Sequence, residues 1–353
     1  SSSSSARMFS ASSGMMLAIL YIYSQGLRDY AGAFQVVAEA IFLAMPHPIQ
    51  PNSFLSIHQV AKVNSERLLL FVFDTFSGRM FPRRLPSAAA QEGARGLLQL
   101  VLAKRHEPPV NAFWRKDAED QKRADEHLAS MKGIQFPYLL LLAGIDVRGF
   151  FRCMQTAINK KYALQPPRAG DADEAPSPPE APSSPSASSS SSSSSSFRAP
   201  PQTVGSLLRN LYNFCKYAES RQLEQPLGLR VQMLTVLQDE IVECDENVPK
   251  SLVRDLVDFM IQKPDAARDR HVHDQVTKLA RKHSDIFDQR LRDDLQTLGF
   301  WRALLTLVKS RTHIDNVSEF KQALLCYFNE HDPEFQLSVF TFIDEVLSFF
   351  GAS

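Results

Sequence analysis

The sequence lacks a net charge, because its 353 residues hold 39 lysines and arginines against 39 aspartates and glutamates. A polybasic nucleic-acid or membrane-surface binder needs clustered positive charge, so this balance argues against both classes. Cysteine is scarce too: Cys153, Cys215, Cys244 and Cys326 lie far apart, and no pair has CxxC spacing. Neither a zinc knuckle nor a disulfide framework is indicated, and a reducing cytosol suits the four thiols best.

Long hydrophobic runs are also missing. Met15–Tyr23 is apolar but much shorter than the about 20 residues that a transmembrane helix needs. It lacks a convincing small-residue cleavage site, which argues against a signal peptide. Ile134–Ile145 is almost wholly apolar, yet it ends at Asp146 after about a dozen residues, the length of a buried helix rather than a span.

The sequence has no nucleophile elbow, Walker loop or G-x-G-x-x-G motif. His271, His273 and Asp274 in "RHVHDQ" are candidate metal ligands, but on a helix the two histidines point about 200° apart. An acidic cluster has no glycine-containing calcium loop and is interpreted as solvated surface; it consists of Asp239, Glu240, Glu243, Asp245 and Glu246. We therefore expect no enzyme activity, no catalytic, cofactor-binding or metal-binding residues, and no cofactor.

Composition divides the chain. With 44% hydrophobic residues, the length allows roughly two domains. Residues 166–201 are rich in proline and serine and contain almost no residue that could be buried, so this insert is predicted to be disordered. The serine-rich residues 1–14 are interpreted in the same way. Two helical blocks remain, residues 15–165 and residues 202–353.

Apolar residues in the second block recur with the 3.6-residue period of a helix. The predicted stripes lie in 204–218, 229–244, 252–261, 272–283, 295–308 and 320–328, with a last helix carrying Val339, Phe342 and Phe350. Asn316 before Glu319 resembles a capping box, and Asp332-Pro333-Glu334 predicts the start of the last helix.

The first block is less regular. Leu68–Phe73 could be a strand, but Glu66 and Arg67 precede it at helical pitch, so we interpret it as a buried helix. Gly78 predicts a helix stop and a turn, and Pro82 agrees with that break. Lys116–Lys132 alternates its charges, which is typical of a solvated helix. The sequence therefore predicts an all-α fold, an α-solenoid of stacked helical hairpins with a degenerate repeat.

Four segments then carry a family resemblance. They are "IYSQGLRDYAGAFQVVAEAIF" (Ile22–Phe42), "LLLFVFDTFSGRMFPRRLP" (Leu68–Pro86), "FPYLLLLAGIDVRGFFRCMQTAI" (Phe136–Ile158) and "CYFNEHDPEFQLSVFTFIDEVL" (Cys326–Leu347). In this order they resemble the central helical region of the vacuolar protein sorting-associated protein 8 family. The last segment also resembles the clathrin heavy-chain repeat.

The most specific part of the match is Phe136, Pro137, Asp146, Arg148 and Phe150. Phe136–Ile145 is predicted to be a buried helix that closes at Gly144. Asp146 should cap the next helix, which runs from Val147 to Ile158, with Arg148 exposed on its first turn.

The resemblance implies a non-catalytic scaffold subunit of the CORVET endosomal tether, acting in vesicle fusion and in protein transport to the vacuole or lysosome. It implies other CORVET and HOPS subunits as partners, an early-endosomal Rab GTPase, and a cytoplasmic location, peripheral on endosomal or vacuolar membranes. The family's β-propeller and RING domain have no counterpart in this sequence, as four scattered cysteines cannot form a RING. Two alternatives stay open: another clathrin-repeat protein, either a sister tether subunit or a coat component, and an enzyme with an unrecognised site.

Overall fold

The computed structural model describes residues 13–106, 129–164, 202–223, 228–310 and 332–351, with isolated positions at 122, 125–126, 321, 324–326 and 328–329. The segments expected to be disordered, 166–201 and nearly all of 1–14, lie outside these residues. So do most of Lys116–Lys132, the Asn316–Glu319 capping box and much of the stripe at 320–328.

Contacts divide the chain into two compact units. One comprises Ser1–Ile49, Gln59–Tyr138 and Thr156–Thr203, and the other comprises Gln50–His58, Leu139–Gln155 and Val204–Ser353. This division follows contacts and not composition, so the boundaries drawn from composition at residues 14, 165 and 201 stay predictions.

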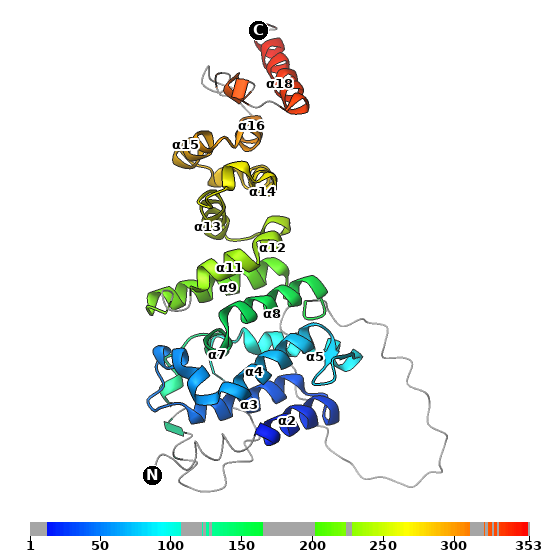
Figure 1. The fold of residues 1–353 in the computed structure, drawn as a ribbon, viewed down its shortest axis with the longest axis vertical. Helices are drawn as coiled ribbons and strands as arrows, with labels where there is room; N and C mark the ends of the chain where they lie inside the picture. Colours follow the sequence, from blue (N-terminus) through cyan, green and yellow to red (C-terminus); the bar gives the residue numbers. More distant parts are fainter. Residues whose placement is uncertain are drawn as a thin grey trace, which may run out of the picture. The chain divides into compact units, whose positions relative to one another are not determined.

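The first unit is helical. Its elements are α2 (Ser13–Tyr21), the π-helical turn η1 (Ile22–Gly26), α3 (Tyr30–Ala44), most of α4 (Ile57–Phe76) and α5 (Ala88–Val101). Figure 1 labels these α-helices. Two of them, α3 and α5, start at capping residues. Asp29 Oδ1 accepts the backbone N–H of Gly32 at 2.7 Å, and Ser87 Oγ accepts that of Ala90 at 3.3 Å. Helix α3 packs against both α2 and α5, and so it lies at the centre of this unit.

Helix α4 confirms the interpretation of Leu68–Phe73 as helix. Leu68, Phe71 and Val72 are buried while Leu70 is exposed, which is the burial pattern of a helix with one apolar face. The helix ends at Phe76, and Gly78 follows with a φ of 69°, as the predicted stop requires.

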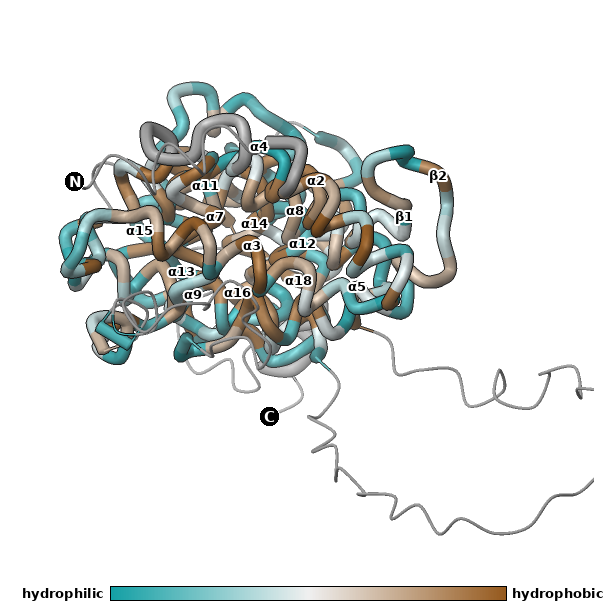
Figure 2. Tube along the Cα trace, turned by 90° about the horizontal axis from the view of Figure 1, so that it is seen from below, coloured by the Kyte–Doolittle hydropathy of each residue, from teal (hydrophilic) through white to brown (hydrophobic). Residues whose placement is uncertain are grey.

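A short β-hairpin follows the stop, where the sequence predicted only a turn. Strand β1 (Arg79–Met80) pairs antiparallel with β2 (Leu85–Pro86), so that Arg79 faces Pro86 and Met80 faces Leu85. The hairpin packs on α5 through β1, and Figure 2 shows it projecting beyond that helix. No other strand occurs in the described part of the chain.

The apolar run before Asp146 forms α7 (Pro137–Ile145), and α8 (Val147–Lys160) follows after a single residue. Every residue from Tyr138 to Ala143 is buried, so this stretch is a buried helix as predicted. The carbonyl of Asp146 accepts the N–H of Phe150 at 2.8 Å, which makes Asp146 the residue that precedes α8. Arg148 is exposed on the first turn, also as predicted.

The predicted role of Gly144 is wrong. It lies inside α7, which continues to Ile145, and it does not close the helix. A Cβ at this position would lie 2.2 Å from the carbonyl oxygen of Phe54 in the 3-10 turn η2 (Pro51–Ser56). Glycine is needed here because the backbone of another segment approaches closely, and not because the chain must turn.

The second unit holds α9 (Val204–Ser220), α11 (Leu229–Val236), α12 (Gln238–Glu243), α13 (Lys250–Ile261), α14 (Arg270–Lys282), α15 (Gln289–Leu298), α16 (Trp301–Lys309), α18 (Pro333–Gly351) and the 3-10 turns η3 (Ala266–Arg268) and η4 (Ser284–Ile286). Each helix packs on near neighbours in the chain: α11 on α9 and α13, α14 on α12, α13 and α16, and α16 on α14, α15 and α18. This is the contact pattern of stacked helical hairpins, and it confirms the all-α, solenoid-like class.

Two predicted single stripes are each two helices. The stripe at 229–244 breaks at Leu237, which has a φ of −104° and separates α11 from α12. The stripe at 295–308 breaks at Gly299, whose left-handed φ of 78° ends α15 before α16 begins. Leu237 and Phe300 are both fully buried, so the apolar period runs on through each break and hides it.

Helix α18 begins as predicted. Asp332 Oδ1 accepts the N–H of Glu334 at 3.0 Å, and the Asp332 carbonyl accepts that of Gln336 at 2.9 Å. Asp332 also forms an ion pair with Arg302 of α16, so the same carboxylate caps α18 and joins it to its neighbour. Val339 and Phe342 are buried as the stripe predicted.

We expect Gly144→Ala to destabilise the protein by about 1–3 kcal/mol, because the added methyl group meets a backbone carbonyl that cannot move independently. The matched control is Gly96→Ala in α5, where the nearest atom to the new methyl group is the Ala31 Cβ at 3.9 Å. The control should gain about 0.5–1 kcal/mol from helix propensity. Denaturant unfolding measures both variants, and identical midpoints would contradict the close approach.

We expect Asp332→Ala to cost about 0.5–2 kcal/mol of local stability at the start of α18, the usual loss for an N-cap. Hydrogen exchange of the Glu334 and Gln336 amides should accelerate. Asp332→Asn keeps a capping acceptor but loses the charge that pairs with Arg302, and it should give a smaller acceleration. Unchanged exchange in the alanine variant would show that Asp332 does not hold this helix end.

Candidate interaction surfaces

The histidines weighed as metal ligands lie apart on α14. His271 is exposed, with its Nε2 3.5 Å from Asp239 Oδ1. The His273 ring stacks on Phe300, with centroids 4.1 Å apart and planes 14° from parallel. Within the described residues, no group of three or more histidine, cysteine or acidic side chains could hold a metal ion.

The acidic cluster on and after α12 is largely solvent-exposed, as interpreted from the sequence, and only Glu240 is half-buried. Its side chains also bond to other helices. Glu240 accepts a hydrogen bond from Gln155 of α8 at 2.8 Å, and Glu246 accepts the backbone N–H of Gly205 in α9 at 2.8 Å. The others reach α14 or the residues near it: Asp239 bonds Gln275, Glu243 pairs with Lys278, and Asp245 pairs with Lys282. The cluster therefore links α12 to three other helices.

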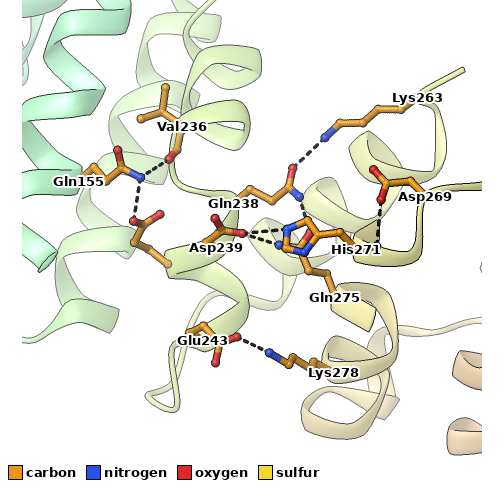
Figure 3. Close-up of polar contacts among 11 residues, drawn as sticks. Gln155, Val236, Gln238, Asp239, Glu243, Lys263, Asp269, His271, Gln275 and Lys278 are labelled. Atoms are coloured by element: carbon orange, nitrogen blue, oxygen red, sulfur yellow. Dashed lines mark hydrogen bonds and ion pairs between the residues drawn. The ribbon is translucent and has the colours of Figure 1, made fainter. Parts of the chain in front are cut away.

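We define the polar junction as Gln155, Gln238, Asp239, Glu240, Glu243, Gln275 and Lys278. Figure 3 labels all of them except Glu240. The centre of the junction is Gln275, which is only 4% exposed, receives a hydrogen bond from Gln238 and donates one to Asp239. Lys263, just after α13, donates to Gln238 at 2.9 Å. A buried amide must keep its partners, and so the junction fixes how α12 and α14 lie against each other.

Two carboxylates in and beside the junction, Glu243 and Asp245, pair with lysines of α14. The Lys278 ammonium, through its hydrogen bond and its charge, lowers the pKa of Glu243, and Lys282 lowers the pKa of Asp245 in the same way. Both carboxylates are solvent-exposed, so these ion pairs contribute little to the stability of the fold. Their main effect is to hold the paired side chains in place.

A groove of about 780 Å³ adjoins the junction between α12, α14, α16 and α18. Leu305 and Phe335 contribute its apolar part, and paired ions such as Arg302 and Asp332 line much of the remainder. Binding sites for small molecules are mostly apolar with a few convergent polar groups, whereas the walls of this groove are largely ionic. We therefore interpret the groove as a gap between stacked helices and not as a small-molecule binding site.

Two buried acidic residues in the first unit, Glu39 and Asp74, were missed in the sequence, because no local pattern shows that they are buried. His106 Nε2 lies 2.8 Å from Glu39 Oε2, and both side chains are almost fully buried beside the ring of Tyr138. Asp74 of α4 is 1% exposed, and the nearest cation is Arg84 Nε, at 3.6 Å from its Oδ2. Neither oxygen of Asp74 has a hydrogen-bond partner among the residues that the structure describes.

Burial raises the pKa of Asp74, and the charges of Arg84 and Arg79 only partly oppose that rise. The folded protein therefore binds the proton of the Asp74 carboxyl more tightly than the unfolded chain does. As the pH rises above the pKa that Asp74 has in the unfolded chain, Asp74 lowers the free energy of unfolding.

The first unit also exposes apolar side chains for which the fold itself gives no explanation. They include Tyr21, Ile22 and Leu27, which are 45%, 56% and 63% exposed at and beside the π-helical turn η1.

We expect Asp74→Asn to raise the unfolding midpoint at neutral pH, because the amide carries no charge to desolvate. The gain should shrink as the pH falls through the raised pKa of Asp74, where the native carboxyl becomes neutral too. Denaturant unfolding at several pH values measures this.

Asp288→Asn is the matched control of opposite sign. The hydrogen bond from the Leu291 N–H, and then Arg254, lower the pKa of Asp288, so this variant should lose stability at neutral pH and the loss should fade in acid. If the stability changes of Asp74→Asn and Asp288→Asn depended on pH in the same direction, the opposite pKa shifts of the two aspartates would be contradicted.

Stacked helical hairpins with exposed side chains on their outer faces define the helical-repeat class of proteins, which bind other proteins along extended surfaces. Residues 6–158 match the family model described as the Vps8 central TPR. The match covers less than half of the chain, and it agrees with the resemblance seen in the sequence for that part. No curated protein and no solved structure gives a match to the chain.

Proposed function

We propose that the chain is a non-catalytic scaffold of a CORVET-like endosomal tethering complex, acting in vesicle fusion and in transport to the vacuole or lysosome. The observation that carries the proposal is the Vps8 central TPR match over residues 6–158. The stacked helices of each unit support it, because solenoid faces are long surfaces for protein partners.

The exposed apolar turn at η1 adds specific support. Tyr21, Ile22 and Leu27 lie within the matched segment, and π-helical turns occur frequently at functional sites. Aromatic and aliphatic side chains that are largely exposed favour contact with another protein. We take this turn as a contact site for another tether subunit.

Association with the membrane would then depend on protein partners. Among the described residues, no helix is long and apolar enough to cross a bilayer. Other CORVET or HOPS subunits, together with an early-endosomal Rab GTPase, would hold the chain on the cytoplasmic face of the endosome.

The test is affinity purification of the tagged endogenous chain under mild conditions, with identification of the proteins that accompany it. We expect the core subunits shared by the CORVET and HOPS tethers. If coat components appear in their place, the chain serves another clathrin-repeat assembly, and if the purified chain alone turns over a substrate, the scaffold proposal fails.

Paired variants locate the contact. Ile22→Asp should lower recovery of the tether subunits several-fold, because a charge then enters an apolar interface. Val231→Asp is the control, as Val231 is 53% exposed on α11, outside the matched segment. It should leave recovery unchanged. Equal recovery with both variants would remove η1 from the interface.

A further inference from the structure

The hairpin between α4 and α5 concentrates positive charge on a chain that is neutral overall. Arg79, Arg83 and Arg84 occur within six residues, and no acidic residue lies between Asp74 and Glu92. All three arginines are exposed. Leu85, beside Arg84, is 54% exposed. The hairpin therefore presents an apolar side chain next to a cluster of guanidinium groups.

The hairpin is held in place at its base. Phe81 is buried, and its ring meets that of Phe71 edge-on at 5.7 Å. The N–H of Ser87 donates to the carbonyl of Gly78 at 2.9 Å and closes the loop. A Cβ on Gly78 would lie 2.8 Å from Tyr162, so the base also packs closely against that side chain. A surface fixed in this way needs little ordering when it binds.

The arginines are largely unused by the fold. Arg83 has no ion pair or hydrogen bond with any residue that the structure describes. Arg84 is 57% exposed and approaches only one oxygen of Asp74, at 3.6 Å, which is beyond hydrogen-bonding distance. Arg84 also has a left-handed φ of 55°, a conformation that a non-glycine residue adopts at some cost. Most of their donors are therefore available to another molecule.

We propose that the hairpin Arg79–Pro86 binds an acidic segment of a partner protein, with the carboxylates of that segment on Arg83 and Arg84 and an apolar side chain on Leu85. Arginine forms paired hydrogen bonds with carboxylates, so two adjacent guanidinium groups select closely spaced aspartates or glutamates. Leu85 adds contact area that does not depend on charge. The proposal stands apart from the tethering function, because it needs only this hairpin.

A protein fits the hairpin better than a membrane does. Recognition of anionic lipid typically takes clusters of four to eight basic residues, and this hairpin has three. The net charge of zero gives no wider positive face to support binding to lipid. A short acidic segment needs only the local cluster.

The test uses the full chain and a short fluorescent peptide of glutamates around a single leucine, with binding followed by anisotropy. Arg83→Glu should weaken binding roughly tenfold and flatten its dependence on salt. Leu85→Ala should weaken binding several-fold at every salt concentration, and Arg83→Lys should keep part of the affinity. Arg270→Glu, the same charge reversal on α14, should bind like the native chain.

Thermal unfolding should be nearly unchanged by Arg83→Glu, because Arg83 is exposed and has no hydrogen bond or ion pair with a residue that the structure describes. Equal peptide binding by the Arg83→Glu and Arg270→Glu variants would overturn the proposal. So would binding to phosphatidylserine vesicles that depends on Arg83 when peptide binding does not. Peptide binding seen only after removal of residues 170–198, which include Asp171, Asp173 and Glu174, would identify the chain's own insert as the occupant and would also overturn it.

Discussion

The constraint on which the structure depends is that each helix has one apolar face and must bury it against its neighbours. Val276 and Leu279 of α14 are fully buried, and α14 packs on α16, whose Leu304 and Val308 are buried in turn. No helix can satisfy this requirement alone, so the helices of the second unit stack on their near neighbours in the chain. The surfaces available to partners follow directly from this arrangement.

The polar junction at α12 restricts how that stacking can occur. Apolar faces alone allow neighbouring helices to slide, because dispersion contacts are not directional. Gln275 is buried between Gln238 and Asp239, and a shift of one helical turn would leave its amide without partners. An unsatisfied buried amide costs about 1–3 kcal/mol, enough to disfavour other registers. A short six-residue helix thus sets the alignment of longer ones.

Local patterns in the sequence predicted much of this fold, and tertiary contacts account for the rest. The stripe of α13, from Leu252 to Ile261, is buried as its period required, and Asp332 caps α18 as its neighbours indicated. The break at Leu237 was hidden because that residue is itself buried in phase with the stripe. Gly144 and Asp74 were beyond prediction, since Phe54 and Arg84 reach them only in the folded chain.

The basic hairpin shows what a whole-chain charge can and cannot exclude. A sum of zero argues against binding across a broad charged face, but charges in water act over only about 8 Å at physiological ionic strength. Arg83 has no ion pair with any residue that the structure describes, and Asp74, the carboxylate nearest to Arg84, is buried. The hairpin is therefore a local cluster of positive charge on a chain that is neutral overall. The binding that we propose is a property of the hairpin Arg79–Pro86 and not of the composition of all 353 residues.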